Sequence, residues 1–431
     1  MILGIDLGSS FFKASLFNPD GRVLGQGTAP VPYLPAESRR VEIPVKGAQS
    51  AFHACVQAAL QGAGARMRDI AACAITSQAQ TFTVADPQGR ALFPFISWRD
   101  TRTIDDNIAA TALAEFPRHC SVAECLPCLT VAQLAFRRRQ TGQGCTPGDS
   151  VLFLPTWFVR CLTGKSVVDT NLAAMSGLYS LPGRDWWPAA LDLCGLTPAN
   201  LPVLAEIGTP AGRTTTAAEA FGLPTDIPVI LAGNDQTAGA FGAGIESQQA
   251  ALITLGTAQV VYACRPDLPP PTPGMIRGPY PEGRYYQLAA DTCGAATINW
   301  VCSVLPGCET PQALDRLAES ASPDCHGVRF LADGPNGTGR WTGTGNPQAT
   351  TADQARAVFL CLADRMADML ARFSPRPTRA LVAGGGRHSA IWMDTLEHRL
   401  GIPLQPVDHA DPARGAFRLV RKAISPPLSS R

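Results

Sequence analysis

The sequence predicts a mixed α/β protein with two large domains, and three observations support this prediction. The chain has 431 residues, which is longer than a domain with a single hydrophobic core usually is. Apolar residues make up 45% of it, so each half can bury a core of its own. The two halves also start alike, because Leu7-Gly8-Ser9 and Leu255-Gly256-Thr257 each join two short apolar runs in the pattern of a β-hairpin. We therefore predict domains at 1–226 and 227–431.

Apolar and alternating runs predict the elements of each half in order. In the first half they predict strands at 1–6, 11–17 and 22–24, a helix over 48–62, a buried strand at 70–76 and a mostly helical stretch over 103–181. In the second half they predict strands at 227–233, 251–255 and 258–264, an amphipathic helix over 352–373, a strand at 380–383 and a helix over 389–400. Strands at the start of each half, followed by helices, fit two α/β domains.

Charge and hydropathy exclude several classes of function. Lys and Arg total 36 against 35 Asp and Glu, so nothing in the charge balance favours nucleic acid or an anionic membrane as a partner. No apolar run approaches the roughly 20 residues of a membrane span. Met1 leads directly into Ile2 and Leu3 without the basic start of a signal peptide. We expect a cytoplasmic protein that acts on a small molecule, and the sequence leaves open whether it forms a homodimer.

The fourteen cysteines are expected to be thiols, as is usual in a reducing compartment. The tightest group is Cys120, Cys125, Cys128 and Cys145. Cys125 and Cys128 have the spacing of metal ligands, but the other two do not repeat it. A zinc site is one interpretation of this group, and thiols packed in a helical hairpin are the interpretation we favour.

The two hairpin turns are candidate phosphate sites. A Gly beside a Ser or Thr lets backbone N–H groups converge on an anion, and the hydroxyl adds a donor. The turns supply Gly8, Ser9 and Ser10 in one half, and Gly256 and Thr257 in the other. A third glycine loop, Gly384-Gly385-Gly386, lies between a strand and a helix, which suits close approach of a ring or a phosphate. The alternatives are ordinary hairpin turns and a tight left-handed turn.

Two charged residues flank the first turn. Asp6 ends the first strand, where a carboxylate can hold Mg²⁺ directly or through water. The alternative is an Asp that accepts hydrogen bonds from turn N–H groups. Lys13 lies on the returning strand, where its side chain reaches a phosphate or points into solvent.

Asp235 is the residue that we predict to be the catalytic base. It stands in Gly233-Asn234-Asp235-Gln236, between a buried strand and a helix of small residues, and such a turn directs side chains into a binding site. A position at a helix start favours the ionised carboxylate, so we expect a lowered pKa. A weak base is sufficient for phosphoryl transfer, which needs mostly positioning. The alternative is that Asp235 only caps the helix.

Polar side chains in two further segments suggest a pocket for a polyol. Ser77-Gln78-Ala79-Gln80 follows a predicted strand, and Trp98-Arg99-Asp100-Thr101-Arg102 follows the next hairpin. Gln, Asp and Arg side chains bind sugar hydroxyls through paired hydrogen bonds. The Trp can stack on a sugar face or fill the core.

Taken together, these motifs resemble the FGGY carbohydrate kinases almost from end to end. The matching segments are Gly4-Ile5-Asp6-Leu7-Gly8-Ser9-Ser10, Trp98 to Arg102, Asp169-Thr170-Asn171, Ser176-Gly177-Leu178, Gly233 to Gly244, Leu255-Gly256-Thr257, Cys293-Gly294-Ala295-Ala296 with Trp300, and Gly384 to Trp392. The resemblance implies two ribonuclease-H-like, actin-type (ASKHA) domains with an interdomain cleft. It implies a sugar pocket and the first phosphate turn in domain 1–226, and nucleotide binding with the catalytic Asp in domain 227–431.

The resemblance also implies transfer of the γ-phosphate of ATP, with Mg²⁺, to a sugar hydroxyl. Residue by residue, it makes Asp235 the general base and places Asp6 and Asp235 beside the metal. The implied nucleotide contacts are Gly8, Ser9, Ser10, Lys13, Gly256, Thr257, Gly294, Gly384, Gly385 and Ser389. The implied sugar contacts are Gln78, Gln80, Asp100, Arg102, Asn171 and Gln236.

The chain departs from the family pattern in ways that bear on its substrate. Xylulokinase-like members usually carry Gln-Met-His-Gly where this chain has Gln78-Ala79-Gln80-Thr81, and Arg414 stands where a small residue is typical. We expect an ATP-dependent kinase for a ketose or polyol, with D-xylulose or a related pentulose as the leading substrate. The alternative is an actin-like nucleotide-binding sugar sensor without phosphotransfer, and ADP release with a panel of sugars would distinguish the two.

Overall fold

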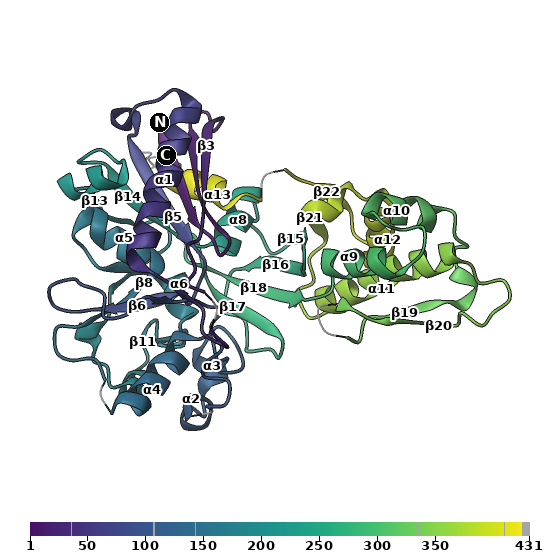
Figure 1. Ribbon diagram of the computed structural model, residues 1–431, viewed down its shortest axis with the longest axis horizontal. Helices are drawn as coiled ribbons and strands as arrows, with labels where there is room; N and C mark the ends of the chain where they lie inside the picture. The colour runs from purple at the N-terminus through teal and green to yellow at the C-terminus, as the bar shows by residue number, and fades with distance from the viewer. Residues whose placement is uncertain (36, 107, 143, 335–336, 409, 425–431) are drawn as a thin grey trace. The chain divides into compact units, whose positions relative to one another are not determined.

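The structure is a computed structural model that describes residues 1–35, 37–106, 108–142, 144–334, 337–408 and 410–424. The chain forms two compact units. The first contains Met1–Gly244, Asp267–Tyr285 and Ala410–Arg431, and the second contains Ile245–Pro266 and Tyr286–His409. Each unit is built on a β-sheet with helices packed on it (Figure 1).

The sheet of the first unit has six strands in the order β13-β14-β5-β1-β2-β3. They are β1 (Ile2–Leu7), β2 (Phe11–Phe17), β3 (Val23–Pro30), β5 (Ala72–Ser77), β13 (Pro210–Arg213) and β14 (Pro228–Asn234). β1 runs antiparallel to β2 and parallel to β5, and β14 runs parallel to β5. All six residues of both β1 and β5 are buried, as expected for central parallel strands covered on both faces.

Helices cover both faces of this sheet. Because side chains alternate along a strand, Phe12 and Phe17 of β2 point to opposite faces. Phe12 packs edge-on against Phe158 of α5 (Leu154–Thr163), which stacks on Phe52 of α1 (Val45–Ala63). Phe17 packs instead against Phe417 of α13 (Pro412–Ile424). The helix α8 (Asp235–Ala243) packs on α13, so α13 lies beside the turn that connects β14 to α8.

The predicted boundary at residues 226 and 227 does not coincide with the division into compact units. Strand β14, predicted to open the second domain, lies in the first sheet, because its apolar side chains are buried by parallel pairing with β5. The helices α8 and α13 belong to the first unit as well. Asp235 therefore lies in the unit that contains Asp6, and not in the unit that contains Gly256.

The remaining elements of the first unit differ from the mostly helical stretch that the sequence predicts over 103–181. The helices α4 (Thr130–Thr141) and α5 end at Gly142 and Gly164, each with a positive φ, as helix C-termini favour. Short strands interrupt the helices. The other elements are β4 (Glu42–Ile43), β6 (Phe82–Ala85), β7 (Phe95–Ile96), α2 (Ile108–Ala112), α3 (Phe116–His119), β8 (Ser150–Phe153), β9 (Val167–Asp169), α6 (Thr170–Ala174), β10 (Tyr179–Ser180), β11 (Asp185–Trp186), α7 (Pro188–Cys194), β12 (Val203–Ala205) and β17 (Met275–Tyr280).

The second unit repeats the arrangement at the start of the first. Its sheet contains β18-β16-β15-β21-β22 in that order, and β15 runs antiparallel to β16 and parallel to β21, as β1 does to β2 and β5. The predicted internal duplication is therefore present in the sheet topology. The elements are β15 (Ala250–Leu255), β16 (Gln259–Arg265), β18 (Arg284–Asp291), α9 (Ala295–Val304), α10 (Pro311–Glu319), β19 (Arg329–Leu331), β20 (Arg340–Thr342), α11 (Thr351–Ala371), β21 (Arg379–Ala383), α12 (Ala390–Leu400) and β22 (Leu404–Pro406).

The fourteen cysteines are all free thiols. Cys125 and Cys128 lie in the irregular segment between α3 and α4, and not in a helical hairpin. In the described part of the chain, no three His, Cys, Asp or Glu side chains are arranged to hold a metal ion. Among the same residues, no helix combines the length and the apolar character needed to cross a membrane.

Candidate active site

The β1–β2 hairpin brings Asp6 and Lys13 together. They are directly opposite residues in the antiparallel register, with Asp6 only 5% exposed and Lys13 exposed. The turn between them needs Gly8, because a Cβ there would lie 2.9 Å from the Phe11 carbonyl oxygen. Tyr33 donates its hydroxyl hydrogen to the Ser9 carbonyl at 2.8 Å. A hydrogen bond from a residue outside the hairpin thus holds the predicted phosphate turn, and Ser10 is exposed at the tip of the turn.

The Asp6 carboxyl is buried and poorly satisfied. Its Oδ1 atom has no hydrogen-bond partner in the described structure. Burial raises the pKa of Asp6 well above its usual range, the charge of Asp235 raises it further, Lys13 opposes the shift and Asp411 adds to it. Asp411 was not predicted from the sequence. The sequence feature that could have indicated Asp411 is its position one residue before Pro412, where a helix can begin. In the structure, the Asp411 carboxylate accepts the Ala413 N–H in the first turn of α13 at 3.1 Å.

The turn from β14 to α8 presents Asp235. Gly233 has φ +70°, in the left-handed region that glycine enters without strain, and Asn234 is extended. Asn234 is the N-cap, since its side chain accepts the Thr237 N–H at 3.0 Å. Asp235 is therefore the first residue inside the helix, and the alternative interpretation of Asp235 as the helix cap is wrong.

The pKa of Asp235 moves in the direction opposite to the one predicted. Burial raises the pKa of Asp235 to about 6, although the Gln236 N–H and the charge of Lys13 act to lower it. The helix start does favour the anion, but one backbone N–H at 2.7 Å does not replace the water lost on burial. A carboxyl with a pKa of about 6 is ionised at neutral pH and is a stronger base than an exposed aspartate.

Two of the predicted sugar residues present side chains that can receive a ligand. Gln236 is exposed, and the partly exposed Gln80 has φ +60°, an uncommon conformation for a residue with a side chain. In the described structure, the Gln80 carboxamide has no hydrogen-bond partner. Trp98 is 40% exposed, so it does not fill the core. Thr81 ties the two segments together, because its hydroxyl accepts the Trp98 N–H at 3.2 Å.

The other predicted sugar residues use the polar groups of their side chains in hydrogen bonds within the protein. Gln78 is 3% exposed and donates to the Gly8 carbonyl at 3.3 Å, which places it beside the phosphate turn. Asn171 is fully buried and donates to the Thr237 hydroxyl at 3.0 Å and to the Pro279 carbonyl at 2.8 Å.

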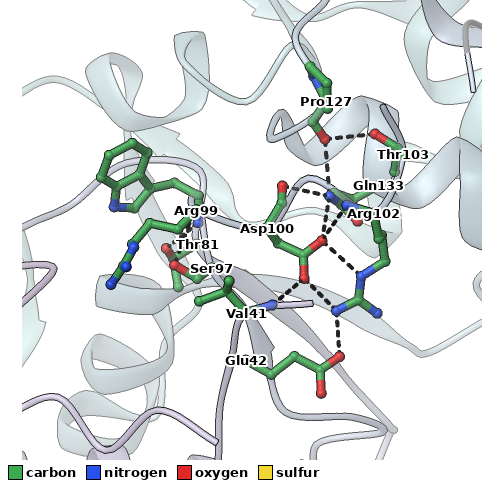
Figure 2. Close-up of polar contacts among 11 residues, drawn as sticks. Val41, Glu42, Thr81, Ser97, Arg99, Asp100, Arg102, Thr103, Pro127 and Gln133 are labelled. Carbon is green, nitrogen blue, oxygen red and sulfur yellow. Dashed lines mark hydrogen bonds and ion pairs between the residues drawn. The ribbon is translucent and has the colours of Figure 1, made fainter. Parts of the chain in front are cut away.

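Asp100 and Arg102 form the network shown in Figure 2. The fully buried Asp100 carboxylate accepts from the Val41 N–H at 2.8 Å, from the backbone and guanidinium of Arg102, and from Gln133 at 3.3 Å. Arg102 also donates to Glu42 at 2.6 Å. With five protein donors on its two oxygens, Asp100 has no lone pair left for a sugar hydroxyl, and the network holds the loop that carries Trp98 and Arg99.

In the second unit, the predicted nucleotide contacts converge on one end of β15. The Gly256 and Thr257 carbonyls accept the N–H groups of Ala295 and Ala296 at 2.8 and 3.1 Å, and a Cβ on Gly294 would lie 2.8 Å from the Gly256 oxygen. Gly384 has φ +90°, and a Cβ on it would lie 2.4 Å from the Leu255 oxygen. A Cβ placed on Gly385 would have no neighbouring atom within 4 Å. These loops therefore form one cradle with open backbone at Gly385.

Ser389 has a structural role as well as a predicted one. It is the N-cap of α12, accepting the Trp392 N–H at 3.2 Å and donating to Asp315 at 2.9 Å. The third glycine loop thus leads through a short 3₁₀ turn, Gly385–His388, into a capped helix.

The carboxylates of the first unit fit a divalent cation that also binds phosphate. Asp6 has a buried oxygen without a partner, and the charges of Asp235 and Asp411 act on it. Mg²⁺ usually takes one or two carboxylates and completes its shell with water and substrate phosphates, so a full protein cage is not required.

The comparisons with known proteins concern the family and the fold of the chain. Residues 1–242 match the model of the FGGY family of carbohydrate kinases, N-terminal domain. The chain is 28% identical over 460 residues to the xylulose kinase of Escherichia coli (strain K12), covering 100% of this chain and 91% of that protein. It is 27% identical over 352 residues to the L-fuculokinase of Escherichia coli O157:H7, covering 78% and 74%.

A solved structure confirms the fold. The crystal structure of xylulose kinase from Rhodospirillum rubrum superposes with a TM-score of 0.89 at 22% identity, covering 99% of this chain and 90% of that chain. Likeness at this identity concerns the fold alone. The predicted actin-like, ribonuclease-H-like α/β fold is confirmed.

Proposed function

The chain belongs to the FGGY family of carbohydrate kinases, and on that premise we propose that it transfers the γ-phosphate of ATP to a hydroxyl of a ketose or polyol. The single observation that carries the mechanism is the Asp235 carboxyl, which stands at the start of α8 with one hydrogen bond and a pKa of about 6. Such a group is ionised at neutral pH and has an oxygen available for a substrate hydroxyl.

We propose D-xylulose or a related pentulose as the best substrate. The names of the two relatives, xylulose kinase and L-fuculokinase, each indicate a sugar substrate. The xylulose kinase aligns with the whole of this chain. Gln80 replaces the His that is usual in xylulokinase-like members, and its carboxamide retains a donor and an acceptor. Gln80 and Gln236, whose side chains are accessible, are the sugar contacts that the geometry supports best.

Asp235 is proposed to orient the acceptor hydroxyl and to take its proton as the oxygen attacks phosphorus. In the loose transition state of phosphoryl transfer, little proton removal precedes attack, so the main task of the carboxylate is orientation. Partial burial of the Asp235 carboxylate strengthens its hydrogen bond to the hydroxyl, because less water competes for it than at a fully exposed aspartate. The proton received by Asp235 then returns to solvent.

Each unit contains residues that we propose as nucleotide contacts. They are Gly8, Ser9, Ser10 and Lys13 in the first unit, and Gly256, Thr257, Gly294, Gly384, Gly385 and Ser389 in the second. Asp6 would hold Mg²⁺ with support from Asp235, and the bound ion would neutralise charge on the phosphates. Lys13, exposed opposite Asp6, is placed to offer a further positive charge to a phosphate.

A panel of sugars tests the proposal. ADP release would be measured with D-xylulose, L-fuculose, other ketoses, glycerol and no sugar, for the wild type and Asp235→Asn. We expect D-xylulose or another pentulose to give the highest kcat/KM, and Asp235→Asn to remove sugar-dependent ADP release. A protein that binds sugar and ATP without releasing ADP with any of them would contradict phosphotransfer and favour the sensor.

A further inference from the structure

The turn that carries Asp235 has backbone groups that the sheet does not pair. The regular register between β14 and β5 ends at Leu231 and resumes only at Asn234, which is opposite Ser77. The N–H groups of Gly233 and Asn234 are buried at this irregularity, where an unpaired donor is costly. Their partners therefore determine where the first turn of α8 lies.

Both partners come from the segment Asp169-Thr170-Asn171. The Gly233 N–H donates to Asp169 Oδ2 at 3.3 Å, and the Asn234 N–H donates to Asn171 Oδ1 at 2.9 Å. A Cβ at Gly233 would lie 3.3 Å from Asn171 Oδ1, so the two segments are in close contact. This segment, which begins α6, thus binds the backbone immediately before Asp235.

Asn171 also holds the helix just after Asp235. Its Nδ2 atom donates to the Thr237 hydroxyl at 3.0 Å and to the Pro279 carbonyl of β17 at 2.8 Å. With Oδ1 engaged by Asn234, both amide hydrogens and the oxygen of this fully buried side chain are bonded to protein. One residue therefore fixes positions 234 and 237, on either side of Asp235.

The Asp235 side chain has little support of its own. Within the described residues, its only hydrogen bond comes from the Gln236 N–H at 2.7 Å, which belongs to the same turn. The direction of its carboxylate is therefore set by the backbone, and the backbone is set by Asn171. Displacement of a reacting group by about 1 Å can reduce a rate by roughly 10²-fold.

We propose that Asn171 is a positioning residue for phosphate transfer, which aims Asp235 through the backbone of residues 234 and 237 and does not contact the sugar. This inference rests on the proposed role of Asp235 as the base. It replaces the sugar contact that the sequence suggested for Asn171, because every hydrogen-bonding group of its side chain is already used inside the protein.

The chain provides a matched control in Asn200. This side chain is 3% exposed in the same unit, donates to the Thr146 and Asp149 carbonyls at 3.1 and 2.9 Å, and accepts the Thr197 N–H at 2.9 Å. Its Oδ1 atom also accepts the Thr197 hydroxyl at 3.0 Å, so Asn200→Leu removes four hydrogen bonds from a buried amide, and Asn171→Leu removes three. Only Asn171→Leu removes them from the turn that carries Asp235.

The experiment measures single-turnover phosphate transfer by rapid quench, with kcat and the sugar KM, for wild type, Asn171→Leu and Asn200→Leu. We expect Asn171→Leu to lower the transfer rate about 10- to 100-fold, with KM within about threefold of wild type. Asn200→Leu should leave the rate within about twofold. A raised sugar KM with an unchanged rate in Asn171→Leu would show a sugar contact and overturn the proposal, as would equal rate losses in the two variants.

Asn171→Asp covers the case in which Asn171→Leu does not fold. It keeps the size of the side chain and the acceptor for Asn234, but it cannot donate to Pro279. We expect a loss of about 10-fold in the transfer rate without a change in KM, and a wild-type rate would overturn the proposal. Asp235→Asn, measured in parallel, separates the two ideas, because full activity in that variant would refute the base assignment while the Asn171 comparison still reports on the turn.

Discussion

Asp235 of the first unit and Asp353 of the second both lie in the first turn of a helix, and their carboxyl groups have opposite properties. Burial acts on each to raise its pKa. The pKa of Asp235 is raised to about 6, whereas hydrogen bonds from His326 and Thr350 outweigh burial and lower the pKa of Asp353 to about 2. The difference is therefore not explained by the helix, which offers both residues a similar dipole.

The number of donors explains the difference. Asp353 Oδ2 accepts from the Thr350 N–H at 2.9 Å, the Thr350 hydroxyl at 2.7 Å and His326 at 3.0 Å, and its Oδ1 accepts from the Ser322 N–H at 3.1 Å. Asp235 accepts one backbone N–H. The buried Asp353 carboxylate is surrounded by donors and stabilises the structure, whereas the partly exposed Asp235 carboxylate accepts one donor and retains the capacity to bind a substrate hydroxyl.

The largest expected effect comes from exchanging the two carboxyl groups for amides. Asp235→Asn should reduce kcat by a factor on the order of 10²–10⁴, the usual loss of a general base, without lowering the free energy of unfolding. Asp353→Asn should keep kcat and cost about 1.5–3 kcal/mol of stability, because it weakens hydrogen bonds to a charged group. Steady-state kinetics and urea denaturation of both variants check this, and matching losses of activity in the two would break the comparison.

The pH dependence of stability should differ in sign between the two residues. A raised pKa means that the folded state holds the proton of Asp235 more tightly than the unfolded state does. The contribution of Asp235 to the free energy of unfolding therefore falls as pH rises from 3.8 to about 6. The lowered pKa of Asp353 contributes stability above 3.8 that is lost as pH falls towards about 2. Asp235→Asn should therefore gain stability relative to wild type between pH 4 and 6.

Denaturation midpoints across pH 2 to 8 measure these contributions. Asp353→Asn should approach the stability of wild type only below pH 4. His326 has a raised pKa because Asp353 accepts its hydrogen bond, so its contribution is complete below 6.5 and declines at higher pH. If the Asp235→Asn difference were the same at every pH, the raised pKa would be wrong.

A smaller effect is expected at Lys13. Lys13 lies on β2, and its charge acts to lower the pKa of both Asp6 and Asp235. Lys13→Met should move the inflection of the pH–rate profile to higher pH and reduce kcat at pH 6 by about two- to fivefold, in line with the energy of an exposed charge pair. An inflection that moves to lower pH would show that Lys13 does not act on these carboxylates.

Local patterns predicted the secondary structure around the candidate site correctly. Both hairpins, the glycine loop and the strand-to-helix turn before Asp235 depend on residues close in sequence, and the structure has all of them. The domain division was not predictable in the same way. β14 joins the first sheet through pairing with β5, more than 150 residues earlier in the chain, and no local pattern reports such a contact.

Properties that depend on burial and on hydrogen-bond partners could not be predicted from the sequence either. The sequence shows Asp100 and Asn171 as polar side chains beside a predicted pocket, whereas the structure surrounds them with protein partners (Figure 2 for Asp100). Asp411 acts on Asp6 because α13 returns to the first sheet from the far end of the chain. The raised pKa of Asp235 has the same origin, since desolvation is a property of the packed structure.

The most direct test is the pH dependence of kcat/KM for the preferred sugar in wild type and Asp235→Asn. We predict that the wild-type value falls tenfold per pH unit below an inflection near 6, and that the residual rate of Asp235→Asn shows no inflection there. A wild-type profile that stays level through pH 6 down to 4, or a variant that keeps the wild-type rate, would contradict the assignment of Asp235 as the base.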